Sequence, residues 1–132
     1  MVTTQGVALK AYIAIEELNK QTFSGPIAKK LFNLYKTLKP VYEFQLQEEK
    51  KIFSKYPEFD PTINGCPVKD NNPEAIERAR TVAKSVDSEL KDLGAIEIDV
   101  DYEPIVIPES EQTNLKISGA FIGYLEGFVD LE

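Results

Sequence analysis

The sequence of 132 residues contains no histidine, and it has a single cysteine, Cys66. The missing imidazole removes the commonest general base, the usual nitrogen ligand of zinc, and any nucleophile of the Ser-His or Cys-His type. One thiol cannot form a disulfide within the chain, which favours a reducing, intracellular setting. We therefore expect a protein that is not an enzyme and that uses no cofactor and no metal ion.

Long apolar runs are also missing. The longest uncharged stretch, near Ile117 to Leu125, is too short to cross a bilayer, and the first residues lack the pattern of a secretory signal. Apolar residues make up 42% of the chain and charged residues 28%, which is ordinary for a globular protein. We expect one domain over residues 1–132 that does not associate with membranes.

Basic residues are scarce at the C-terminal end. From Gly94 onward there are nine acidic residues and one base, Lys116, so this part has a net charge of −8. The whole chain has a net charge of −7, so the residues before Gly94 have a net charge of +1. Such an acidic end on a nearly neutral body disfavours direct binding to nucleic acid or to anionic membranes.

The stretch from Ser24 to Tyr56 has the periodicity of one long helix. A first apolar stripe recurs every three or four residues, and a second stripe lies beside it. The Ser24-Gly25-Pro26 sequence is typical of a helix start, and Pro40 predicts a kink or a division of the helix. The first stripe consists of Ile27, Leu31, Leu34, Leu38 and Val41, and the second of Phe32, Tyr35, Tyr42, Leu46 and Phe53.

The flanking segments complete an α+β, mainly helical fold. A helix over residues 7–19, which Thr3 or Thr4 can cap, should form an antiparallel hairpin with the long helix, after a short lead-in over residues 1–6. A third helix should run from Pro73 to Gly94. Alternating apolar and acidic residues then predict a strand over residues 96–103, followed by strand residues 105–107, a short helix over 119–125 and a last strand over 128–131. We predict a helical body over 1–93 and a small antiparallel sheet within 94–132, in which the last strand pairs with part of 95–107.

Three acidic residues of the predicted strand, Asp99, Asp101 and Glu103, are the best candidates for a chemical site. Residues two apart on a strand project from one face, so their carboxylates can converge on Ca²⁺ or Mg²⁺. The alternative is a solvated face whose like charges prevent unwanted pairing of an edge strand. Together with Glu109 and Glu111, the same acids can also mimic the phosphates of nucleic acid.

Two tyrosines of the long helix, Tyr35 and Tyr42, form the second candidate site, together with Phe32. They predict either an exposed aromatic patch that binds a protein partner or part of the core, which is the commoner place for helically spaced aromatic residues. Cys66 lies in a proline-rich loop and is expected to be inert.

The predicted hairpin has a charged second arm, Gln47-Glu48-Glu49-Lys50-Lys51, with Tyr56 just beyond it. A later helix is followed by alternating strand residues and by the segment from Ala120 to Phe128. This layout resembles a family of small uncharacterised proteins of tailed phages and prophages of Gram-positive bacteria. At the turn between the helices this chain has Gly25-Pro26-Ile27 where a basic Ser-Arg pair is expected. The resemblance implies a phage setting, in the host cytoplasm or the virion, and no catalytic residues.

We therefore expect a virion or assembly component, or an accessory factor, that works through a protein partner or through self-association. The rival hypothesis is an acidic inhibitor of a host defence or DNA-binding protein, acting through the surface of residues 97–111. An enzyme with a carboxylate-bound metal is the third hypothesis.

Overall fold

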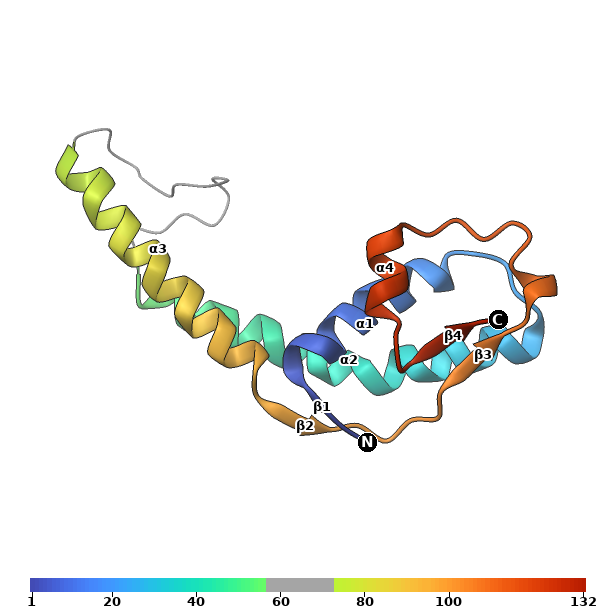
Figure 1. The fold of residues 1–132 in the computed structure, drawn as a ribbon. Helices are drawn as coiled ribbons and strands as arrows, with labels where there is room; N and C mark the ends of the chain where they lie inside the picture. The colour runs from blue at the N-terminus through green and yellow to red at the C-terminus, as the bar shows by residue number, and fades with distance from the viewer. Residues whose placement is uncertain (57–72) are drawn as a thin grey trace.

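The computed structural model describes residues 1–56 and 73–132 and confirms a mainly helical α+β fold (Figure 1). The predicted proline-rich loop that contains Cys66 lies outside the described residues. In chain order the elements are β1 (Val2–Thr4), α1 (Gln5–Asn19), α2 (Gly25–Ser54), α3 (Pro73–Gly94), β2 (Glu97–Asp99), β3 (Ile105–Ile107), the 3₁₀ turn η1 (Glu109–Glu111), α4 (Gly119–Tyr124) and β4 (Val129–Leu131).

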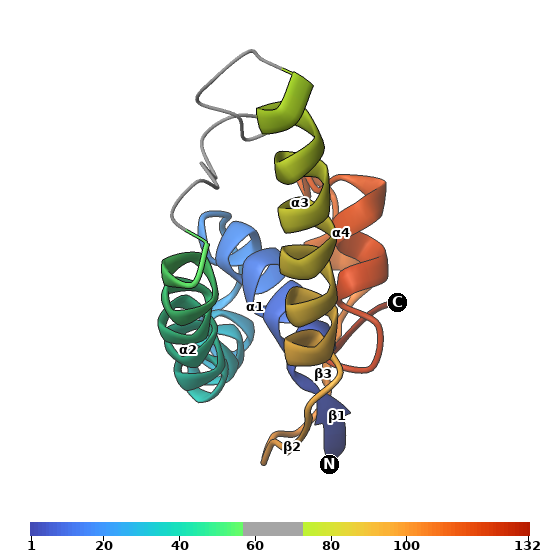
Figure 2. The ribbon, with the colours of Figure 1, turned by 90° about the vertical axis from the view of Figure 1, so that its left-hand side faces the viewer.

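The predicted hairpin of α1 and α2 is the centre of the fold. Thr4 caps α1, because its hydroxyl accepts a hydrogen bond from the Val7 N–H at 3.3 Å. Viewed along α2, α1 lies between α2 and α4, so that α1 is covered on two sides (Figure 2). Its small residues Ala8, Ala11 and Ala14 are fully buried and let the neighbouring helices approach closely.

The long helix α2 is continuous through Pro40. A proline at this position removes one hydrogen bond of the helix and crowds the preceding turn, but it does not divide the element as the sequence allowed. The buried face follows the first predicted stripe before Pro40 and continues beyond it. Its buried members are Ile27, Leu31, Leu34, Leu38, Gln45 and Ile52.

Two apolar clusters lie along α2. The main core joins α1 and the first half of α2 to β3, α4 and β4, with Phe128 and Ile107 at its centre. A smaller cluster lies at the far end of α2, where Ile52 meets Val86 and Leu93 of α3. α3 extends away from the main core beside this end of α2, which gives the molecule its elongated outline (Figure 1).

The start of α1 and the end of α3 cross at a pair of glycines. A Cβ atom on Gly6 would lie only 3.1 Å from the carbonyl oxygen of Gly94, whose own Cβ position is 3.8 Å from the Gly6 Cα. Immediately beyond this crossing the Gln5 N–H donates to the Ile96 carbonyl at 2.8 Å. Gly94 ends α3 as predicted, and the missing side chain of Gly6 is what lets the two helices touch, because a Cβ atom on Gly94 would make only an ordinary van der Waals contact.

The strands form two separate pairs. β1 pairs with β2 in antiparallel orientation, with Val2 opposite Asp99, so residues 2–4 of the predicted lead-in are a strand. β4 pairs with β3, as predicted for the last strand, and Ile105 lies opposite Val129. The prediction of an antiparallel sheet within 94–132 is wrong for this second pair, which is parallel because η1 and α4 carry the chain back to the same end of β3 before β4 begins.

Candidate functional site

The two candidate tyrosines of α2 hold a third tyrosine between them. Tyr12 of α1 stacks on Tyr35 at a ring-centroid distance of 5.0 Å and on Tyr42 at 4.8 Å, with nearly parallel planes in both cases. Its hydroxyl donates to the Tyr35 hydroxyl at 3.0 Å. Tyr35 and Tyr42 lie seven residues apart, two helical turns, which opens a slot of the right width for one ring. They are half-buried and pack against the main core.

The chemistry of Tyr12 suits packing rather than proton transfer. Burial, followed by the hydrogen bond to Tyr35, raises the pKa of Tyr12 well above its ordinary value. A phenol with such a pKa stays neutral near pH 7 and is a poor base or nucleophile there. The sequence pattern pointed to Tyr35 and Tyr42, but it could not show that their partner is Tyr12, from another helix.

Beside the tyrosines, α2 presents an exposed surface that we name the outer flank. It contains Phe32, Lys36, Lys39, Glu43 and Leu46, which follow one another at steps of four and three residues and are all exposed. Phe32 is 53% exposed and Leu46 40% exposed, and the Lys36 ammonium lies 5.3 Å from the centre of the Phe32 ring. The buried residues of α2 lie on the opposite side of the helix, so the flank faces away from the body.

The acidic segment alternates in exposure as predicted. Ile98 and Tyr102 are half-buried and Val100 is buried, and the acidic residues between and around them are exposed. Only Glu97–Asp99 pair as a strand, so the predicted strand is shorter than the range 96–103. Among the described residues no group of three or more acids or cysteines is placed to hold a metal ion.

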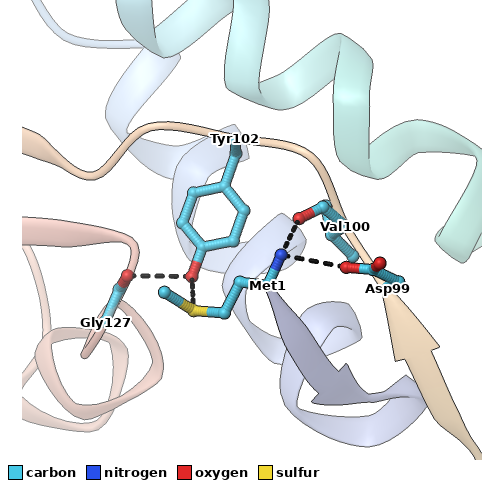
Figure 3. A network of polar contacts seen from close by, with 5 residues as sticks. All are labelled: Met1, Asp99, Val100, Tyr102 and Gly127. Atoms are coloured by element: carbon cyan, nitrogen blue, oxygen red, sulfur yellow. Dashed lines mark hydrogen bonds and ion pairs between the residues drawn. The ribbon is translucent and has the colours of Figure 1, made fainter.

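Asp99 takes part in a polar network that joins β1 to the acidic segment (Figure 3). The Met1 amino group forms an ion pair with Asp99 Oδ1 and donates to the Val100 carbonyl, both at 2.9 Å. The Tyr102 hydroxyl lies 3.0 Å from the Gly127 carbonyl oxygen and 2.8 Å from the Met1 Sδ atom. Burial raises the pKa of Tyr102. Asp101 and Glu103 remain exposed, so the three acids do not share one partner.

Glu111, the last of the predicted acidic set, comes from a distant part of the chain and binds Ser24, the residue that precedes α2. Its carboxylate accepts from the Ser24 N–H at 2.6 Å and from the Ser24 hydroxyl at 2.9 Å. Ser24 therefore starts α2 as predicted, but its hydroxyl is bound to Glu111 instead of to its own helix. A carboxylate at this end of a helix is favoured by the helix dipole. Nearby, the Gln21 amide pairs with the backbone of Lys116 through two hydrogen bonds.

Comparison with known proteins does not place the chain in a family. Models of known protein families, curated proteins and solved structures were all searched, and none matches it. The helices within the described ranges, residues 1–56 and 73–132, include none with the length and apolar character needed to cross a membrane.

Proposed function

We propose that this protein binds another protein through the outer flank of α2 and that it acts without catalysis. One observation carries the proposal: Phe32 and Leu46, two large apolar side chains, stand exposed on the same flank of one long helix. Scattered exposed apolar residues are common, but two on one flank, about 21 Å apart along the axis, give a helix-sized partner two anchors. Burying each would contribute about 1.5–3 kcal/mol before the cost of association.

The half-buried tyrosines support this proposal by making the flank rigid. Tyr35 and Tyr42 are held on either side of Tyr12, so the turns of α2 that carry Phe32 and Leu46 are fixed against α1. A partner that docks on a preorganised helix does not bear the entropic cost of ordering it. This is the helix-in-groove mode of recognition, in which residues at spacings of three and four act as anchors.

We place this binding in a tailed phage, as an assembly or virion component or an accessory factor in the host cytoplasm. The support is the resemblance carried by the charged second arm of the hairpin and by the segment from Ala120 to Phe128. The acidic surface of residues 97–111 is the rival binding surface, and it differs from the flank in offering charge without large exposed aromatic anchors.

The test uses the tagged protein to capture partners from an extract of phage-producing cells. The variant with both Phe32→Ser and Leu46→Ser should lose the captured partner at least about tenfold, because each 1.4 kcal/mol of lost contact lowers affinity tenfold. Phe44→Ser is the matched control, since Phe44 is 39% exposed on a different side of α2 and lies outside the outer flank. Equal capture by the flank variant, or equal loss by the control, would refute the proposal.

A further inference from the structure

The residues of the outer flank are arranged symmetrically about Lys39, and this arrangement indicates which kind of partner fits the flank. Phe32 and Leu46 lie seven residues before and after Lys39, which is two helical turns, or about 10.5 Å, in each direction. Lys36 and Glu43, of opposite charge, lie three residues before and four residues after Lys39. If a second copy of the flank is rotated by 180° about an axis through Lys39, the apolar residues of the two copies therefore lie opposite one another. Lys36 of each copy then lies opposite Glu43 of the other.

We propose that the outer flank binds the same flank of a second copy of this chain, with the two α2 helices antiparallel. This deepens the proposed function and rests on its claim that the flank binds protein. In the pair, Phe32 contacts Leu46 of the second copy twice, and Lys36 faces Glu43 of the second copy twice, as a two-fold axis requires. The axis passes beside Lys39, and the two Lys39 side chains can turn outward, each toward Glu43 of the other copy.

Two features of the described structure favour a second copy. The flank needs no rearrangement, because all five side chains are already exposed on a helix that α1 holds in place. The polar members have no ion pair within the described part of the chain, so Lys36, Lys39 and Glu43 are free to pair across the interface. A partner with only basic or only acidic side chains would satisfy one end of the flank and oppose the other.

The size of the contact predicts a weak dimer. The apolar anchors span about 21 Å of one helix, and a single helix pair of that length buries less than the roughly 1,600 Å² typical of stable specific interfaces. We therefore expect association that depends on concentration, with a dissociation constant of about 10⁻⁵ M or weaker. Salt should weaken it, because the two charged pairs lie at the solvent-exposed rim.

The experiment measures molar mass by light scattering from micromolar to millimolar protein. The wild type should rise from monomer to dimer mass. Lys36→Glu and Glu43→Lys should each stay monomeric, because each change places like charges opposite one another. Mixed in equal amounts, the two variants should form a dimer again, since each then supplies the charge that the other needs. Lys30→Glu, an equal charge change outside the flank, should leave the dimer unchanged.

Three results would overturn the self-pairing. They are a wild type that is monomeric throughout, a dimer that both charge reversals leave intact, and a mixture of the two variants that does not associate. None of these results would contradict the proposed function. A flank that binds a different protein gives a monomer in this experiment, and the variant with Phe32→Ser and Leu46→Ser still loses the captured partner. All the substituted side chains are exposed, and the melting temperature of each variant confirms that it is folded.

Discussion

At the scale of single residues, the buried amide of Gln5 determines how α1 sits on α2. Gln5 is 1% exposed, and its side-chain N–H groups donate to the Val41 carbonyl at 2.8 Å and to Gln45 Oε1 at 3.2 Å. Gln45 in turn donates to Glu49 at 3.0 Å. A buried amide nitrogen that donates two hydrogen bonds to one neighbouring helix favours one alignment of the two helices over neighbouring ones, because a shift would break these bonds.

Replacing this amide should therefore be costly. Gln5→Ala should lower the free energy of unfolding by about 1–3 kcal/mol, because it removes two hydrogen bonds and leaves buried polar atoms of α2 without a donor. Gln47→Ala is the matched control, since Gln47 is exposed on the same helix as Gln45. Urea denaturation measures both, and a Gln5→Ala variant no less stable than the control would show that the network is not structural.

The stacked Tyr12 predicts a loss of stability in alkali. Its pKa is raised in the folded protein, so the stabilisation is complete below its ordinary value of 10.0 and declines as pH rises above it, when the unfolded chain ionises first. Tyr12→Phe keeps the ring between Tyr35 and Tyr42 but cannot ionise. Above pH 10.0 the wild type should lose up to about 1.4 kcal/mol per pH unit relative to this variant. Parallel pH profiles for the two proteins would contradict the burial of the Tyr12 hydroxyl.

At the scale of elements, the close contact between α1 and α3 depends on the missing side chain of Gly6, where α1 crosses Gly94. Gly6→Ala should destabilise the protein by about 1 kcal/mol despite alanine's better helix propensity, because the new Cβ meets the backbone of Gly94, which cannot rotate away. Gly123→Ala in α4 is the control, with nothing within 4 Å of its Cβ position, and it should be neutral or stabilising. If the two variants changed the melting temperature alike, the close crossing would be disproved.

The two apolar clusters predict unequal stability along the molecule. α3 relies on the smaller cluster around Val86 and Leu93, whereas α1 is packed into the main core. Amide hydrogens of α3 should therefore exchange faster than those of α1 under native conditions, because local opening of α3 exposes less apolar surface. Hydrogen exchange followed by mass spectrometry separates the two helices, and equal protection would mean that they unfold as one unit.

The sequence predicted elements well where their signals are local. The spacing of Ile27 to Leu38, the start at Ser24-Gly25-Pro26 and the stop at Gly94 all depend on neighbours within one or two helical turns, and the structure confirms them. The cap of α4 by Ser118 belongs to the same class, since its hydroxyl accepts from the Phe121 N–H three residues on. Local interactions of this kind can be predicted from the sequence without knowledge of the fold.

Features that join distant segments were not predictable. Strand β1 is only three residues long and exists because Val2 pairs with Asp99, and Glu111 binds Ser24 at the start of α2 from 87 residues away. The parallel orientation of β3 and β4 likewise depends on how α4 packs on α1. Among the candidate sites, the spacing of Tyr35, Tyr42 and Phe32 singles them out in the sequence, but it does not predict the outer flank as a whole. The flank is defined by exposed residues at spacings of four and three from Phe32 to Leu46, and these residues can be recognised as exposed only when the buried face of α2 is known.

At the scale of the whole molecule, one long helix divides the protein into a packed side and an open side. α1, α4 and the parallel strands lie on the packed side (Figure 2). The outer flank consists of exposed residues on the opposite face of the helix. The central claim is that this open side contacts a protein.

The most direct test places a photo-crosslinking amino acid at position 32 and, as a control, at position 44. A protein bound on the outer flank should be crosslinked from position 32 and not from position 44, although both native side chains are exposed phenylalanines of α2. Crosslinking of the same protein from both positions, or from neither, would contradict the account.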